Sequence, residues 1–157
     1  MNSAALVLLI VPAVFGACPQ DWRQVDSHCY MISHAKLTWP ESQEMCRALG
    51  GTLATFENSA DISAIAFQLH GDIREEKIWV DGTDAVSEGH WIWASNGHDV
   101  ISSFSGRVSN NDKDKNCLSM DSDHHFRWYA ESCHSEAYYI CERLNVVSSG
   151  AGSVVVG

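Results

Sequence analysis

The chain has 157 residues, with 20 acidic and 10 basic side chains and a formal net charge of −10 at neutral pH. A chain this acidic repels nucleic acid and anionic membrane, so neither is expected as a partner. The same charge suits cationic ligands, calcium or simple solubility.

The N-terminal segment has the composition of a secretion signal. Its first seventeen residues, MNSAALVLLIVPAVFGA, carry no ionisable side chain. An apolar core of about a dozen residues that ends in small residues is typical of a signal peptide and is too short to span a bilayer. Cleavage after Gly16 is favoured over cleavage after Ala17, because the latter places the bulky Phe15 at a recognition position. We therefore predict a signal peptide at 1–16 and a secreted, extracellular protein without membrane insertion.

The remaining segment, about 140 residues, is enough for one domain and too short for two well-packed ones. We expect this domain to span 17–144. The uncharged residues 145–157 follow the last cysteine and have the composition of a flexible tail. An even number of cysteines behind a signal peptide indicates disulfides rather than metal ligands, and six cysteines allow fifteen pairings. The six are Cys18, Cys29, Cys46, Cys117, Cys133 and Cys141.

Two helices are predicted early in the chain. Residues 38–41 (TWPE) combine a capping box with a first-turn proline, and the helix that begins there should end at the glycine pair 50–51. A second helix should begin at Asn58 or Ser59 and end before Gly71. Its apolar residues recur at helical spacing: Ile62, Ile65, Ala66 and Leu69.

Short strand-like segments follow, and two helices followed mostly by strands predict an α+β fold. We expect Trp79, Trp91, Trp93 and Trp128 in the core. The connection between Trp93 and Cys117 has little periodicity, and a connection of this length is usually functional or disordered. The predicted strands are HCYMI (28–32), TLATF (52–56), IWVDGT (78–83), HWIW (90–93), CLSMD (117–121), FRWYA (126–130) and AYYICER (137–143).

No catalytic motif is visible. The sequence contains no GxSxG, HExxH, P-loop or GxGxxG pattern, and cysteines held in disulfides supply no nucleophile. We therefore do not expect an enzyme. A structural role, as in an acidic matrix protein, is a third class, and the absence of long aspartate runs argues against it.

Several segments, in their order along the chain, resemble the C-type lectin-like domain in its long, six-cysteine form. CPQDWRQVDSHCY looks like the family's N-terminal hairpin, IWVDGTDAVSEGHWIW is similar to its WIGL stretch and the acidic turn after it, and AYYICER matches its closing strand. The match runs from about Cys18 to Arg143. The resemblance implies a C-type lectin-like fold with a long loop region and the disulfides Cys18–Cys29, Cys46–Cys141 and Cys117–Cys133.

Sugar-binding members of this family hold a calcium ion through an EPN or QPD tripeptide, a Glu before the fourth cysteine and the Asn-Asp of a WND motif. Counted from the cysteines, the last two positions here read Lys115-Asn116 and Tyr129-Ala130, and the tripeptide falls in RVSNN (107–111), without acid or proline. Calcium needs six to eight oxygens, several of them anionic, and a nearby ammonium repels it. We therefore predict that the sugar-associated calcium site is absent.

The family's auxiliary calcium site is matched better. Asp84 and Glu88 match two of its acidic ligands, and Asn116 is a candidate neutral ligand, so these three residues form a weak calcium candidate. The alternative is that both acids are turn residues on a solvated loop. Otherwise no cofactor is expected. Further oxygens nearby in the sequence belong to Asn111, Asp112 and Asp114.

His124 and His125, with Asp121 or Asp123, are a candidate zinc site. Adjacent residues on a strand point to opposite faces, so an exposed turn between two strands is the better interpretation of this pair.

Without calcium, recognition depends on aromatic stacking and side-chain hydrogen bonds. The resemblance places the ligand face on the long loop and the strands beside it. There, Lys115 and Arg107 suit an anionic glycan, a sulfate or a protein carboxylate, or alternatively pair with nearby aspartates. The candidate ligand-binding residues are Arg107, Asn110, Asn111, Lys115 and Tyr129, with Phe104 and Phe126 on the same segments.

The resemblance implies a recognition protein of innate immunity that binds carbohydrate or microbial surface ligands, and the replaced ligand positions predict binding without the family's sugar-site calcium. Its partner is then a glycan or glycoprotein. The alternative is a calcium-independent protein-binding module that forms a homodimer through the long loop.

Overall fold

The helix at the capping box forms as predicted. In the computed structural model, which describes residues 16–57, 61–65, 76–100, 108, 112–122 and 127–145, α1 (Trp39–Ala48) begins directly after Thr38. The Thr38 N–H and hydroxyl both donate to the Glu41 carboxylate, at 3.0 and 2.7 Å, and these bonds lower the pKa of Glu41. Gly50 follows the helix with a φ of 80°, a conformation that favours glycine.

The second predicted helix is described only in part. Residues 61–65 are helical, and Ile65 packs into the core with an exposed fraction of 2%. Both ends of this predicted helix lie outside the described residues. So do the predicted signal peptide, up to residue 15, and the predicted tail, from residue 146. Within the described part of the chain, no helix is long and apolar enough to cross a membrane.

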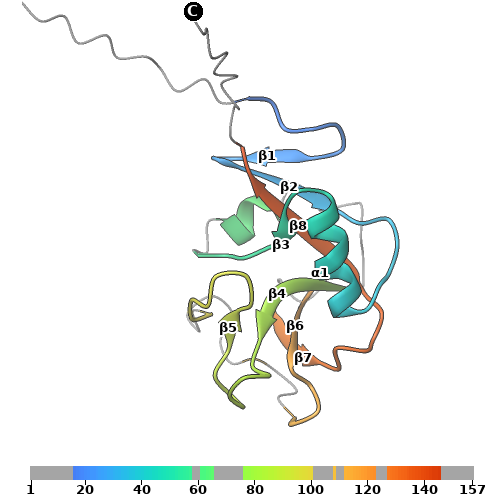
Figure 1. Cartoon of the computed structure of the whole chain (residues 1–157), viewed down its shortest axis with the longest axis vertical. Coiled ribbons are helices and arrows are strands. Elements are labelled where there is room, and N and C mark those ends of the chain that lie inside the picture. The colour runs from blue at the N-terminus through green and yellow to red at the C-terminus, as the bar shows by residue number, and fades with distance from the viewer. Residues whose placement is uncertain are drawn as a thin grey trace, which may run out of the picture.

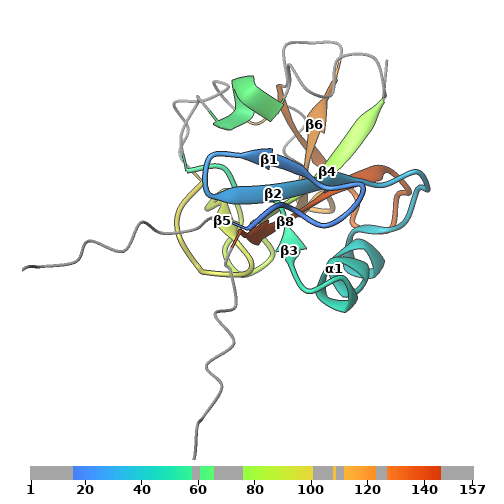
Figure 2. The same ribbon diagram turned by 90° about the horizontal axis from the view of Figure 1, so that it is seen from above.

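The strands join into one mixed sheet with the order β1-β2-β8-β4-β6-β7, in which β3 also pairs with β8 and β5 with β4 (Figure 1). β4 and β8 run parallel, and the other pairings are antiparallel. Viewed from above, α1 and the helical residues 61–65 lie on opposite sides of β2 and β8, which confirms the α+β class (Figure 2). The strands are β1 (Arg23–Val25), β2 (His28–Ile32), β3 (Thr52–Leu53), β4 (Lys77–Thr83), β5 (Ile92–Trp93), β6 (Cys117–Asp121), β7 (Trp128–Glu131) and β8 (Tyr138–Leu144).

Two predicted strands are shorter in the structure than in the prediction. TLATF forms a strand only at Thr52–Leu53, and HWIW only at Ile92–Trp93. The first shortens because Ala54 divides its hydrogen bonds between two strands: its N–H donates to Ile140 of β8 at 2.8 Å, and its carbonyl accepts from Asp81 of β4 at 3.0 Å. The segment therefore crosses the gap between β8 and β4 instead of continuing one ladder.

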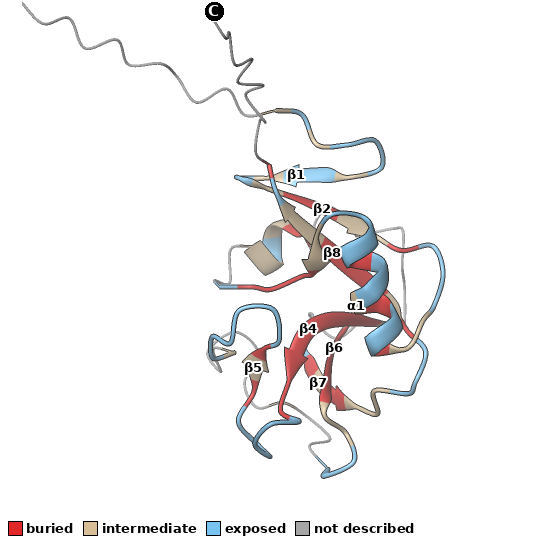
Figure 3. Cartoon of the chain, in the orientation of Figure 1, coloured by how far each residue is buried: buried red, intermediate tan, exposed pale blue. Residues whose placement is uncertain are grey.

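The core has two parts, separated by the alternation of side chains along β4. Ile78 and Val80 face one part, which includes the predicted tryptophans 91, 93 and 128, while Trp79 faces the second part, beside α1. All four tryptophans are buried, as predicted. Figure 3 shows β4 and β6 as almost continuously buried strands at the centre of the molecule. They pack so closely that a Cβ at Gly82 would lie 2.5 Å from Leu118 Cδ2, which explains the glycine.

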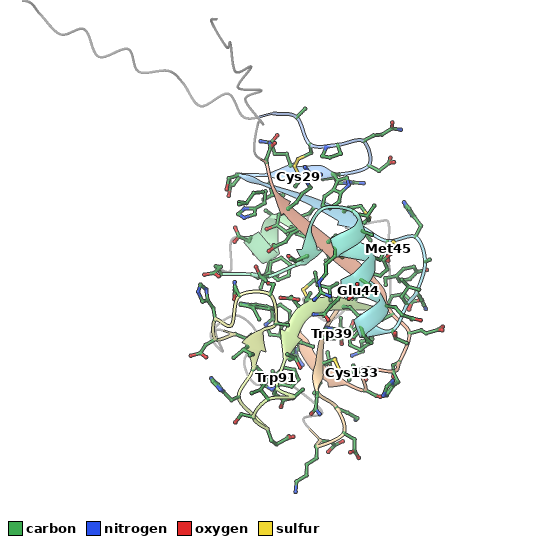
Figure 4. All side chains as sticks on the ribbon, viewed as in Figure 1. Cys29, Trp39, Glu44, Met45, Trp91 and Cys133 are labelled. Atoms are coloured by element: carbon green, nitrogen blue, oxygen red, sulfur yellow. A yellow bond between two sulfur atoms is a disulfide. The ribbon has the colours of Figure 1, made fainter. Side chains whose placement is uncertain are left out.

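Three disulfides have the pairing that the resemblance implied: Cys18–Cys29, Cys46–Cys141 and Cys117–Cys133. Their Cα–Cα distances of 5.6, 5.3 and 5.2 Å are ordinary for disulfides. The second links residues 95 positions apart and removes about 4–5 kcal/mol of unfolded-chain entropy in the simple loop model. The third lies close to the start of α1, where Trp39 N–H donates to the Cys133 carbonyl at 3.1 Å (Figure 4).

Candidate functional site

The turn that follows β4 is fastened to the segment that precedes β6. Asp84 is 1% exposed, and its Oδ2 accepts from Gly89 N–H at 2.9 Å. When the side-chain amide of Asn116 is oriented so that its nitrogen faces these acceptors, Asn116 donates to Asp84 Oδ1 at 3.1 Å and to the Lys113 carbonyl at 3.3 Å. Thr83 Oγ1 donates to the Asn116 carbonyl at 2.6 Å. These contacts hold the end of the long loop against the turn.

The structure brings together two of the three calcium candidates. Asp84 and Asn116 are in contact, and their side chains are already engaged by protein groups, whereas Glu88 is exposed on the turn. A calcium ion would compete with the Gly89 N–H and the Asn116 amide for the Asp84 oxygens. Among the residues that the structure describes, no group of three or more His, Cys, Asp or Glu side chains is placed to hold a metal.

Lys115, at the position where sugar-binding relatives carry a carboxylate, forms an ion pair. Its Nζ lies 3.2 Å from Asp112 Oδ2, and its backbone N–H donates to the Asp112 carbonyl at 2.8 Å. This is one of the pairings left open by the sequence. The Lys115 side chain keeps 32% of its surface exposed and that of Asp112 72%, so the ammonium remains accessible to an incoming anion.

The other two substituted positions lie on β7 and face opposite sides of the sheet. Ala130 is 0% exposed and packs in the core with Trp128. Tyr129 is half-buried, and its ring is covered by Lys77, whose Nζ lies 3.1 Å from the ring centroid. Tyr129 therefore does not present that face of its ring for stacking on a ligand.

Lys77 was not identified from the sequence. Its Nζ lies 3.5 Å from Glu131 and 3.7 Å from Asp121, in addition to the Tyr129 ring. The contact arises because β6 lies between β4 and β7, which places residues from three strands on one face. A charged residue directly before a predicted strand carries no signal of this arrangement.

Several predicted residues lie outside the described part of the chain. These are the candidate ligands Arg107, Asn110 and Asn111, the aromatic residues Phe104 and Phe126, and the histidine pair His124 and His125 with Asp123. Their predicted roles stay predictions.

A partly buried acid, also missed by the sequence analysis, joins three strands of the sheet. Glu142 on β8 pairs in register with Tyr30 of β2 and with Thr52 of β3, and its Oε1 accepts from Thr55 Oγ1 at 2.7 Å. Burial raises the pKa of Glu142 to about 7, although the hydrogen bond from Thr55 acts in the opposite direction. The sequence marks this residue only as part of a closing strand.

The mixed sheet, the two helical segments and the three disulfides define a C-type lectin-like fold, in agreement with the resemblance. The sequence profile of the family described as "Lectin C-type domain" matches residues 35–143. Because this match covers more than half of the chain, the protein belongs to that family, whose members are lectin-type binding domains.

Relatives at moderate identity support the assignment. The hepatic lectin of Gallus gallus is 26% identical over 132 residues, covering 82% of this chain and 60% of that protein. The galactose-specific lectin nattectin of Thalassophryne nattereri is 30% identical over 79 residues, or 50% of each chain. The chain thus spans only about half to three fifths of these two relatives. A solved structure titled a calcium-independent type II antifreeze protein superposes with a TM-score of 0.70 at 21% identity, over 83% of this chain and 96% of that one, and shows the shared fold.

Proposed function

We propose that this protein is a secreted, non-enzymatic recognition module that binds carbohydrate, including microbial surface glycans, without calcium at the family's sugar position. The observation that carries the proposal is the environment of the substituted positions. Lys115 places an ammonium in the loop, paired with Asp112, and Ala130 contributes only a methyl group, buried in the core. Neither position supplies the anionic or amide oxygen that a calcium ion requires.

The remaining polar groups indicate how such a module would hold a ligand. Lys115 has three donors and a partner that is itself mostly exposed, so an anionic glycan can compete with Asp112 for the ammonium. The Asp84–Asn116 contact keeps the Lys115 segment in place beside the turn after β4. Binding by this route depends on ionic strength, because solvent-exposed charges are screened by salt.

The relatives support this proposal. A hepatic lectin and a galactose-specific lectin are among them, which favours carbohydrate as the ligand class. The similar structure described as a calcium-independent antifreeze protein shows that the fold occurs without dependence on this ion. We therefore propose that any calcium at the Asp84 turn is weak and is not required for ligand binding.

A glycan array run with calcium and again with chelator tests the proposal. We expect the same anionic or neutral glycans to bind in both conditions, and Lys115→Ala to reduce the anionic signals by about tenfold. Lys113→Ala, which removes an exposed lysine two residues away, is the matched control and should leave the signals unchanged. Binding that disappears with chelator would contradict the calcium claim. No glycan signal in either condition would contradict the ligand class and favour the protein-binding alternative.

A further inference from the structure

A small polar pocket lies between α1, β3, β4 and the turn after β5, outside the residues assigned to the loop face. Its volume is about 200 Å³. The residues that matter for its chemistry are Gln43 and Arg47 of α1, Leu53 of β3, Asp81 of β4 and Ser95 after β5. This size is below that of pockets for drug-like molecules and fits a single small ring.

The floor of the pocket is a fixed carboxylate. Asp81 is 1% exposed, and its Oδ2 accepts from Ser95 N–H at 2.7 Å. Its backbone is held on both sides, because its N–H donates to Ala54 at 3.0 Å and its carbonyl accepts from Ala94 N–H at 2.9 Å. A group held this firmly loses little freedom when a ligand binds.

The Asp81 carboxylate has capacity for a further donor. Ser95 donates to the carboxylate through its N–H, and the side chains of Ser95 and Gln43 act to lower the pKa of Asp81, whereas two carboxylate oxygens offer about four acceptor positions. Burial raises the pKa of Asp81, because these hydrogen bonds do not fully replace the lost hydration. One more hydrogen-bond donor from a ligand would complete its environment.

The rim of the pocket supplies hydrogen-bond donors, in contrast to the carboxylate acceptor at its floor. The side chain of Arg47 is 58% exposed and contacts Glu44 through one of its nitrogens, so further N–H groups of its guanidinium are available. An anionic ligand is disfavoured by Asp81 and a cationic one by Arg47. A hydroxyl satisfies both, since it can donate to the carboxylate and accept from the guanidinium, while Leu53 supplies an apolar wall.

We propose that this pocket binds one compact, neutral, polyhydroxylated ring, the size of a single sugar unit, with a ligand hydroxyl placed between Asp81 and Arg47. The site is separate from Lys115 and does not depend on the function proposed for the loop face. It would give the protein a second, weaker carbohydrate contact.

Nuclear magnetic resonance titration of the full chain, labelled with ¹⁵N, tests this site. The probes are the methyl glycosides of mannose, galactose and N-acetylglucosamine, added up to on the order of tens of millimolar, because one ring in a small pocket binds weakly. We expect at least one of them to shift the Ser95 backbone amide and the Gln43 side-chain amide. Gln43→Ala and Arg47→Ala should each weaken this binding about tenfold, through lost hydrogen bonds.

Lys115→Ala is the control at the other site and should leave these shifts unchanged. The proposal is overturned if none of the three glycosides shifts Ser95, or if the affinity measured there is the same in the Gln43→Ala, Arg47→Ala double variant. Shifts at Ser95 with a negative glycan array would support the pocket and contradict the loop-face function. The opposite pair of results would support the loop face and contradict the pocket.

Discussion

Two aspartates on or next to β4 have the same burial and different surroundings. Asp81 and Asp84 are each 1% exposed. Asp84 is enclosed by the Gly89 N–H and the Asn116 amide, and it joins two segments of the loop end to each other. Asp81 is held by one turn on one side and borders an open pocket on the other. Burial alone therefore does not distinguish a structural carboxylate from one that can meet a ligand, whereas the identity of its remaining neighbours does.

The same contrast between buried and accessible positions applies to the positions that sugar-binding relatives use for calcium. The largest loss of stability is expected on substitution there. Ala130→Asp restores the carboxylate of the WND motif, but it places a charge among core residues that are 0–1% exposed, such as Trp128. We expect a loss of about 3–5 kcal/mol in the free energy of unfolding, measured by urea denaturation, and no gain of calcium binding. Tyr129→Asn, at the half-buried neighbouring position, should lower the free energy of unfolding clearly less than Ala130→Asp does. Equal stability of Ala130→Asp and the wild type would show that this position is not core.

Asp84→Ala tests the structural role of the enclosed aspartate. It leaves the Gly89 N–H and the Asn116 amide without their acceptor, so we expect a loss of about 2–3 kcal/mol, seen as a lower urea midpoint. Glu88→Ala removes an exposed acid from the same turn and should change stability by less than about 0.5 kcal/mol. If the two variants behaved alike, the described contact between the turn and Asn116 would not stabilise the loop.

Glu142 gives a prediction for pH. Its pKa rises from 4.5 in the unfolded chain to about 7 in the folded protein, so between these values the folded state binds more protons. The stabilising effect of protonated Glu142 is complete below pH 4.5 and is lost as the pH rises to 7, by at most about 3 kcal/mol. Glu142→Gln mimics the protonated form, so the stability difference between variant and wild type should grow from pH 5 to pH 8. A difference that is constant with pH would contradict the shifted pKa.

The smallest effect is expected at the Lys77–Tyr129 contact. Lys77→Met keeps the aliphatic stem and removes the charge that lies over the ring and between two carboxylates, so we expect a loss of about 1 kcal/mol in thermal unfolding. Lys36→Met is the control, because Lys36 lies 5.1 Å from the centroid of the Tyr138 ring and its side chain is 39% exposed. A larger loss in the control would show that proximity to the ring does not set the energy.

Sequence patterns predicted the features that depend on neighbouring residues. The capping box set the start of α1, the glycine pair marked its end, and alternating segments located most strands. The disulfide pairing came from the family resemblance, since six cysteines alone leave it open. TLATF was predicted too long because its middle residue, Ala54, bonds to two different strands, a fact of sheet order that no local pattern contains.

The candidate site was less predictable for the same reason. The sequence correctly raised the pairing of Lys115 with a nearby aspartate, three residues away. It named Tyr129 as a ligand-binding candidate, and nothing local shows that Lys77 lies over the Tyr129 ring from a strand fifty-two positions earlier in the chain. Asp81 of β4 and Gln43 of α1, which line the same pocket, were likewise missed.

Calorimetric titration of calcium into the full chain tests the central claim most directly. With an ammonium at 115 and a buried methyl group at 130, we predict no saturable binding tighter than about 1 mM, the weak limit for extracellular calcium modules. The same titration is repeated on Asp84→Ala, a variant that lacks a ligand of the auxiliary calcium candidate. Stoichiometric binding well below 1 mM that persists in Asp84→Ala would place a strong calcium site elsewhere in the loop region and contradict this account.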